Sequence, residues 1–136
     1  MDFLRSIGIA ASGLRAQAGR MRIISENIAN ADSTGTTPGA DPYRRKITTF
    51  SAHMDRELGA SVVALGRVAR DDAAFRTKDE PGNPAADATG RVKLPNVDPL
   101  VETMDMREAQ RSYEANLNVV TATRRMISRT IDILRA

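Results

Sequence analysis

Apolar residues recur every three or four positions at both ends of the chain, the spacing of one face of a helix. The N-terminal rhythm, which Ser25 interrupts, runs through Leu4, Ile7, Ala11, Leu14, Ala18, Met21, Ser25 and Ile28. The C-terminal rhythm, which Gln110 and Arg124 interrupt, runs through Met106, Gln110, Tyr113, Leu117, Val120, Arg124, Ile127, Ile131 and Leu134. A seven-residue repeat of this kind marks a narrow seam that is buried against another helix.

All six prolines lie between these two periodic segments, so the middle of the chain cannot continue either helix. We therefore predict a mainly α fold, in which two long terminal helices pack as an antiparallel coiled-coil-like pair around a small β-hairpin or irregular region. Residues 1–30 form an N-terminal axial helix, 31–97 a loop and β-hairpin insert, and 98–136 a C-terminal axial helix. Helices of roughly 28 and 37 residues span about 42 and 55 Å, which predicts a rod-shaped subunit with one axial core.

Local signals set the helix ends. Asp2 suits the positive end of the first helix dipole, and Asn30 suits a left-handed residue that stops this helix. The second helix is expected to begin at Asp98-Pro99, because Asp98 can accept from an unpaired amide and Pro99 lacks the N–H that would be unpaired there. Glu102 then lies in its first turn, close to the helix dipole.

Three short strands are predicted in the middle of the chain, from clustered β-branched residues or alternation: Arg45–Phe50, Ser61–Arg70 and Gly90–Val97. The segment Glu80-Pro81-Gly82-Asn83-Pro84 predicts a turn between the last two, with Gly82 able to take a positive φ. The loop from Ala31 to about Pro42 is rich in Ser, Thr, Gly and Pro.

The second helix has a broad apolar side, because Val119, Met126 and Ile133 lie beside the row that contains Val120, Ile127 and Leu134. One partner helix cannot cover both rows, so we expect a neighbouring subunit to cover the second. In the first helix, the small residues from Ala10 to Gly13 favour close approach of another backbone over a mere weak point in the helix.

Composition narrows the function classes. The chain has 136 residues, 20 basic and 17 acidic residues, a net charge of +3, 4% aromatic residues and no cysteine. A near-neutral chain with few aromatic residues does not favour nucleic-acid binding, and the basic run Tyr43-Arg44-Arg45-Lys46 is interpreted as a loop that enters a strand with solvated charges. No segment approaches the ~20 apolar residues that span a bilayer, and no cleavable signal pattern is evident.

Candidate chemistry is sparse. His53 is the single histidine and lies near Asp55 and Glu57, but a second His or a Cys to complete a usual metal site is missing, so we interpret the segment as a solvated, poorly ordered loop. The carboxylate pairs Asp71-Asp72 and Asp105 near Glu108 lie in polar contexts and are interpreted as solvated. We predict no catalytic, cofactor-binding or metal-binding residues.

Several strings resemble those of the FlgC family of flagellar basal-body rod proteins, subunits of the proximal rod, across nearly the whole chain. The strings Ala11-Ser12-Gly13-Leu14-Arg15-Ala16-Gln17 and Asn27-Ile28-Ala29-Asn30-Ala31 resemble the N-terminal signature of rod, hook and related axial proteins. More specific are Pro42 to Lys46, Glu80 to Gly90, Pro95 to Asp98 and Arg111-Ser112-Tyr113-Glu114-Ala115-Asn116. The chain departs from the family pattern at Thr77-Lys78-Asp79, where an aromatic residue is usual, and at Arg91 in place of a Tyr, so hairpin packing is expected to differ locally.

The resemblance implies a structural subunit without enzymatic activity that polymerises helically with itself and other rod proteins and transmits torque through the periplasm. It implies export by the flagellar type III apparatus, a position toward the MS-ring or export-gate end of the rod, no nucleic-acid partner and no direct membrane insertion. The seams and the shared strings together indicate an assembly interface of Leu4, Ile7, Leu14, Met21, Asn27, Ile28, Asn30, Tyr113, Asn116, Leu117, Val120, Ile127, Ile131 and Leu134.

An alternative from another class is a soluble coiled-coil adaptor that binds a partner helix without polymerising. The heptads alone do not separate the two, because they show that helices pair and not what they pair with.

Overall fold

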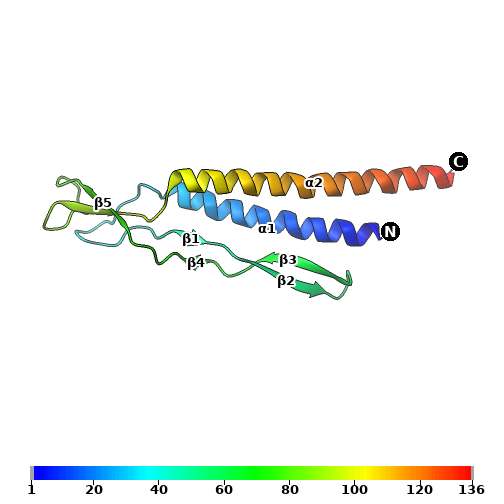
Figure 1. Cartoon of the computed structure of the whole chain (residues 1–136), viewed down its shortest axis with the longest axis horizontal. Coiled ribbons are helices and arrows are strands. Elements are labelled where there is room, and N and C mark those ends of the chain that lie inside the picture. Colours follow the sequence, from blue (N-terminus) through cyan, green and yellow to red (C-terminus); the bar gives the residue numbers. More distant parts are fainter. Residues whose placement is uncertain (1, 136) are drawn as a thin grey trace. The chain divides into compact units, whose positions relative to one another are not determined.

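The computed structural model describes residues 2–135 and contains two long helices, with six short strands between them in the sequence (Figure 1). Helix α1 is Phe3–Ala29 and helix α2 is Pro99–Arg135, of 27 and 37 residues. The strands are β1 Lys46–Ile47, β2 Phe50–Asp55, β3 Ala60–Leu65, β4 Ala69–Arg70, β5 Arg76–Asp79 and β6 Arg91–Leu94. The prediction of two terminal helices around a small β region is confirmed.

Side-chain caps start both helices where the sequence indicates. The backbone N–H of Arg5 donates to Oδ1 of Asp2 at 3.1 Å, and the N–H of Leu100 donates to Oδ1 of Asp98 at 2.9 Å. The prediction of a left-handed Asn30 is wrong, because the positive-φ residues in the described chain are all glycines. Instead, the Asn30 side-chain amide donates to the Glu26 carbonyl at 2.8 Å and satisfies an end of α1 that way.

The strands form three separate antiparallel pairs, β1 with β4, β2 with β3, and β5 with β6. The sequence prediction missed β5 and most of β2. The strand predicted at Ser61–Arg70 is in fact two strands, β3 and β4, which residues 66–68 separate. The turn at Glu80 to Pro84 therefore connects β5 to β6, not a strand at residues 61–70 to one at 90–97. The glycine with positive φ near this turn is Gly90, at 79°, and not Gly82.

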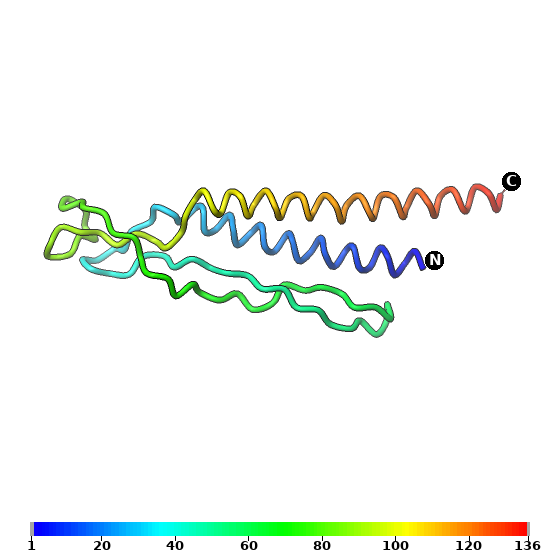
Figure 2. Tube along the Cα trace, viewed as in Figure 1, coloured from blue at the N-terminus to red at the C-terminus, as the bar shows by residue number. Residues whose placement is uncertain are grey.

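The described chain folds into two compact units that both contain helix and strand. Unit 1 contains α1 through Met21, the hairpin segment Thr49–Arg67 and α2 from Arg107 onward. Unit 2 contains Arg22–Thr48 and Val68–Met106. The trace in Figure 2 shows the connectivity: the chain enters the β2–β3 hairpin after β1 and leaves it toward β4.

Small residues of α1 allow close packing in unit 1. Ala10, Ser12 and Ala16 are buried, and a Cβ on Gly13 would lie 2.8 Å from Nδ2 of Asn116 on α2. The stretch is closely packed, as predicted, but its neighbour at Gly13 is a side chain and not another backbone. On another side of α1, the Ser12 hydroxyl accepts a 3.2 Å hydrogen bond from the backbone N–H of Val63 in β3. In unit 1, α1 therefore lies between α2 and the β2–β3 hairpin (Figure 1).

The core of unit 2 gathers apolar residues from the end of α1, the following loop and the segment before α2. Its most deeply buried members are Val92 and Val97, with Ile23, Ile24 and Ala31 close to full burial. Within residues 2–135, neither helix combines the length and the apolar content that a bilayer crossing requires. The fold thus presents helix surfaces and one polar cluster as its candidate functional features.

Candidate assembly interface

The C-terminal part of α2 exposes a large amount of apolar side chain. Ile133 is 76% exposed and Leu134 is 81% exposed. Every residue from 128 to 135 is exposed. Other large apolar side chains that α2 exposes in unit 1 are Leu117, Val119, Met126 and Ile131. Apolar patches of this kind on a folded chain mark interaction sites.

The contacts between the helices explain why this end of α2 is uncovered. Gly13 of α1 lies against Asn116, and Nη2 of Arg20 pairs with Oε2 of Glu108 at 3.3 Å. In unit 1, residues nearer the start of α1 therefore lie beside residues nearer the end of α2. Because α1 begins at Phe3 and is shorter than α2, α1 does not reach the last turns of α2.

The predicted apolar seam of α1 is only partly buried within the chain. Leu4 is 76% exposed and Ile28 is also exposed, whereas Ile7, Leu14 and Met21 are half-buried. In unit 1 the buried positions of α1 are instead small residues beside this seam, because α1 contacts α2 and the hairpin on different sides. In unit 2 the buried positions of α1 are Ile23, Ile24 and Asn27.

The predicted interface residues of α2 divide in the same way. Leu117, Ile131 and Leu134 are exposed, while Tyr113, Asn116, Val120 and Ile127 are half-buried. Two asparagines from the α1 end of the prediction serve contacts within the chain: Asn27 is 1% exposed, and Asn30 caps α1. The exposed apolar residues are therefore the most open to another subunit, and the half-buried ones are partly open.

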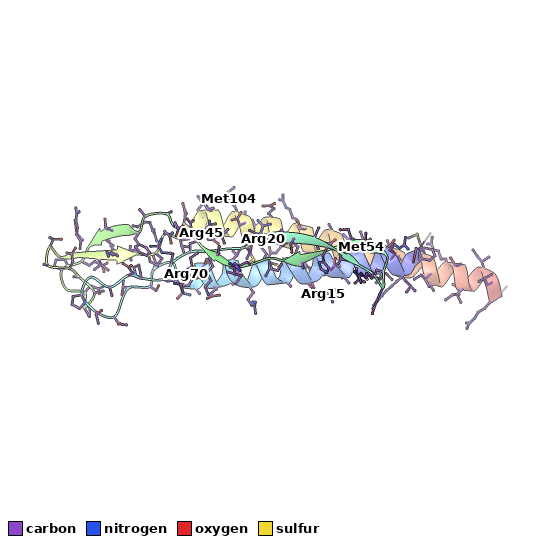
Figure 3. The ribbon with its side chains drawn as sticks, turned by 90° about the horizontal axis from the view of Figure 1, so that it is seen from below. Arg15, Arg20, Arg45, Met54, Arg70 and Met104 are labelled. Atoms are coloured by element: carbon purple, nitrogen blue, oxygen red, sulfur yellow. The ribbon has the colours of Figure 1, made fainter. Side chains whose placement is uncertain are left out.

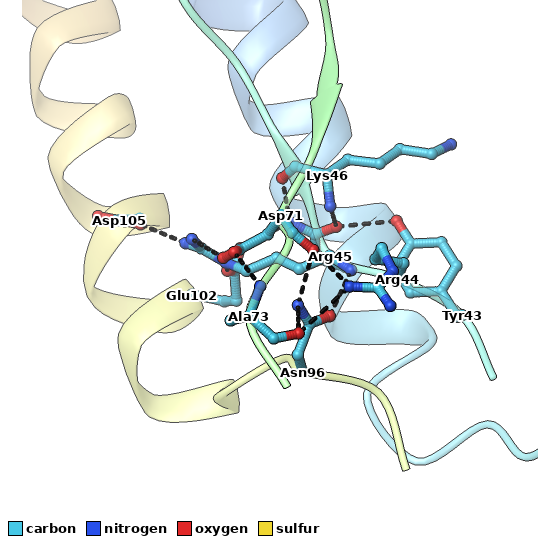
Figure 4. A network of polar contacts seen from close by, with 10 residues as sticks. Tyr43, Arg44, Arg45, Lys46, Asp71, Ala73, Asn96, Glu102 and Asp105 are labelled. Atoms are coloured by element: carbon cyan, nitrogen blue, oxygen red, sulfur yellow. Dashed lines mark hydrogen bonds and ion pairs between the residues drawn. The ribbon is translucent and has the colours of Figure 1, made fainter. Parts of the chain in front are cut away.

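A polar cluster in unit 2 connects α1, β1 and α2 (Figure 4). Asn27 is at its centre: its amide donates to the Lys46 carbonyl at 2.9 Å and to Oε2 of Glu102 at 3.1 Å. Its Oδ1 accepts from the Tyr43 hydroxyl at 2.8 Å and from the Lys46 backbone N–H at 2.9 Å. Because each polar atom of this buried side chain is satisfied, the cluster fixes how the three elements meet.

Arg45 joins the same cluster through three carboxylates. Its Nε donates to Oε1 of Glu102 at 2.5 Å, and its terminal nitrogens lie 3.6 Å from Asp71 Oδ2 and 3.5 Å from Asp105 Oδ2. The Glu102 side chain is 1% exposed, so its charge depends on this pairing. Burial acts to lower the pKa of Arg45, but the hydrogen bond to Glu102 and the nearby carboxylates outweigh it and raise that pKa.

Tyr43 and Arg44 extend the cluster on the β1 side. Burial, together with the negative charges of Glu26 and Glu102, raises the pKa of Tyr43 to about 12. Arg44 donates to the Asp71 carbonyl at 3.0 Å, and its guanidinium lies 4.2 Å from the centre of the Phe75 ring. Lys46 forms an ion pair with Glu26.

These contacts correct three interpretations of the sequence. The basic run from Tyr43 to Lys46 does enter a strand, but its charges are paired and not simply solvated. Asp71 and Asp105 share Arg45 and are only partly exposed. Glu102 is a buried partner of Arg45, a role that the first-turn position alone does not reveal.

The His53 segment is also ordered differently from the prediction. His53 is in strand β2, opposite Val62 of β3, and not in a poorly ordered loop. Within residues 2–135, no group of three or more His, Cys, Asp or Glu side chains is placed to hold a metal ion.

Comparison with known proteins gives family matches in both terminal parts of the chain and relatives that align over nearly the full chain. The family described as flagella basal body rod protein matches residues 7–36, and the family described as flagellar basal body rod FlgEFG protein C-terminal matches residues 88–133.

Individual relatives extend this likeness across the middle of the chain. The flagellar basal-body rod protein FlgC of Agrobacterium fabrum is 55% identical over 128 residues, 94% of this chain and 92% of the relative. The proteins of the same name from Salmonella typhimurium and Bacillus subtilis are 38% identical over 133 residues and 34% identical over 148 residues. These two alignments cover 98% of this chain, and 98% and 99% of the relatives.

Proposed function

The chain belongs to the FlgC family of flagellar basal-body rod proteins, and from this membership we propose that it is a structural subunit of the proximal rod that polymerises helically and transmits torque through the periplasm. The resemblance of the sequence strings to this family is confirmed. The single structural observation that supports the polymerising role is the run of exposed apolar residues on α2.

The exposed run suits contact with neighbouring subunits because burial of apolar side chains stabilises association. Each contact is small, but a polymer repeats it along its length, and long helices resist twist through many such contacts. The interface that we propose includes the predicted residues Leu4, Ile7, Leu14, Met21, Ile28, Tyr113, Asn116, Leu117, Val120, Ile127, Ile131 and Leu134. The exposed Ile133, which lies in the second apolar row of α2, joins them.

For the subunit itself we propose that the helices form an antiparallel coiled-coil-like pair and together make one axial core, with residues 1–30 and 98–136 as the core and 31–97 as an insert. The paired contacts of Gly13 with Asn116 and of Arg20 with Glu108 support this arrangement. At Gly13, the missing side chain of α1 leaves room for the Asn116 side chain of α2.

The partners that we propose are other rod subunits and further copies of this chain, with the MS-ring or export-gate end of the rod as the neighbouring structure. Export by the flagellar type III apparatus is part of the same proposal. The subunit needs no cofactor and catalyses no reaction in this role.

The alternative of a soluble adaptor is not favoured. An adaptor needs only the heptad seams, whereas this chain matches rod proteins through the strands and turns of the middle region as well.

Isolation of basal bodies tests the proposal. In a flagellated species, a strain that lacks its own FlgC and expresses this chain with an affinity tag is expected to build rods. After detergent extraction, the isolated basal bodies should contain the tagged chain. The same strain with an empty vector is the control. Recovery of the tagged chain only in the soluble fraction, with no rods formed, would contradict the proposed function.

A further inference from the structure

The hydrogen-bond pattern of the β2–β3 hairpin leaves the outer edge of β2 open. The N–H of Val63 donates to the Ser12 hydroxyl of α1 and so points away from β2. In an antiparallel pair, facing residues share this orientation, so the backbone polar groups of Ala52, opposite Val63, point away from β3. The 2.6 Å hydrogen bond from Gly66 N–H to the Thr49 carbonyl agrees with this assignment. It shows that the backbone carbonyl of Thr49 points toward the β3 side, so the groups of the next residue, Phe50, point away from β3.

The alternation places the N–H and C=O groups of Phe50, Ala52 and Met54 along one outer edge. Within the described part of the chain, these six backbone groups have no hydrogen-bond partner. Five of the six residues of β2 are exposed, with Phe50 at 43% and Met54 at 66%. The Met54 side chain is labelled in Figure 3. The edge contains no Pro, Lys or bulge, the usual features that protect an edge strand from pairing.

The sequence of β2 is complementary to itself when two copies run antiparallel. With Ala52 facing Ala52 of the partner subunit, Phe50 faces the partner's Met54 in both halves of the contact. Phe and Met pack favourably through a sulfur–aromatic contact. On the opposite face, Ser51 lies across from the partner's His53, so polar residues meet polar residues.

We propose that β2 is a pairing edge for β2 of a second copy of this chain, in a two-fold contact centred on Ala52. The result is a four-stranded antiparallel sheet in which the two hairpins join through their outer edges. The contact goes beyond the rod function. Because a two-fold contact closes on itself, it belongs to the free subunit and not to the repeating contacts of a helical polymer.

Single cysteines test the register directly, because the natural chain has none. Under mild oxidation, Ala52→Cys is expected to form a disulfide-linked dimer, since only residue 52 faces its own copy. Ser51→Cys is the matched control: it is exposed on the same strand but offset from its copy beyond disulfide reach. We expect at least about tenfold more linked dimer from Ala52→Cys. Equal linking of the two variants would overturn the proposal.

A second variant removes the pairing without using cysteine. Ala52→Pro deletes an outward N–H that makes no bond within the hairpin, whereas Ala52→Val keeps this N–H. Sedimentation of the full chain is expected to show dimer for the natural chain and Ala52→Val, and monomer for Ala52→Pro with an unchanged circular dichroism spectrum. A natural chain that is monomeric, or an Ala52→Pro chain that still dimerises, would overturn the proposal.

Discussion

Arg45 shows how strongly one residue can tie unit 2 together. Its side chain is partly exposed, but it is the hydrogen-bonded cation beside the fully buried Glu102 carboxylate. Replacement of Arg45 by Met leaves this carboxylate with only the Asn27 amide, and we expect the free energy of unfolding to fall by about 3 kcal/mol. Urea denaturation followed by circular dichroism measures the change.

The double variant Arg45→Met with Glu102→Leu is the control for this prediction. Since it removes the buried charge together with its partner, it is expected to recover at least about half of the lost stability. A double variant that is as unstable as, or less stable than, Arg45→Met would show that the ion pair is not the cause.

Tyr43 makes the stability of unit 2 sensitive to high pH. Its pKa in the folded chain is raised to about 12 from an ordinary value of 10, so the neutral hydroxyl that donates to Asn27 persists where an unfolded chain has lost its proton. The contribution to stability is full below pH 10 and is lost as the pH rises toward 12. Because Tyr43 is partly solvated, we expect a loss on the order of 1 kcal/mol.

Tyr43→Phe is the matched variant for the pH prediction. Its unfolding free energy is expected to fall less than that of the natural chain between these pH values, because Phe has no proton to lose. Parallel pH curves for the two chains would contradict the assigned role.

For single residues, the sequence predicts those contacts that form between residues close together in the chain. The cap at Asp98 is local and is confirmed, and Asp2, predicted to suit the helix dipole, also accepts a hydrogen bond from the first turn of α1. The pairing of Arg45 with Glu102 spans 57 positions and depends on how β1 meets α2, so no local pattern indicates it.

Among the elements, the packing of α1 depends on its small residues. Gly13 permits the approach of Asn116, and a longer side chain there would separate the helices of unit 1. We expect Gly13→Leu to lower the free energy of unfolding by about 2 kcal/mol, despite the higher helix propensity of Leu. Thermal unfolding measures this effect, with Ala18→Leu on the exposed side of α1 as the control. Equal stability of the two variants would mean that α1 does not pack through Gly13.

The elements also show where periodicity fails as a guide. Helix lengths follow from the heptads and the prolines, and both helices lie within two residues of their predicted bounds. Strand β5, with the sequence Arg-Thr-Lys-Asp, is exposed throughout and shows no apolar alternation. Strand β2 is almost as exposed, so burial leaves little signal in its sequence either.

For the whole molecule, substitutions at the exposed end of α2 are expected to affect assembly of the rod and not the stability of the single subunit. Leu134 is 81% exposed, so Leu134→Asp is expected to leave the stability of the subunit within about 0.5 kcal/mol. In a rod the same side chain would be buried, where an unpaired carboxylate costs several kcal/mol, so the variant should not restore swimming to a strain that lacks FlgC. Arg129→Ala, also exposed, is the control and should restore it. Equal swimming of the two strains would place the interface elsewhere.

The most direct measurement is the structure of a basal body assembled with this chain, by electron cryomicroscopy. The account predicts that Leu117, Ile131, Ile133 and Leu134, exposed in the single subunit, are buried against neighbouring subunits in the rod. Rod density in which these four side chains face open solvent, or in which the chain is absent, would contradict it.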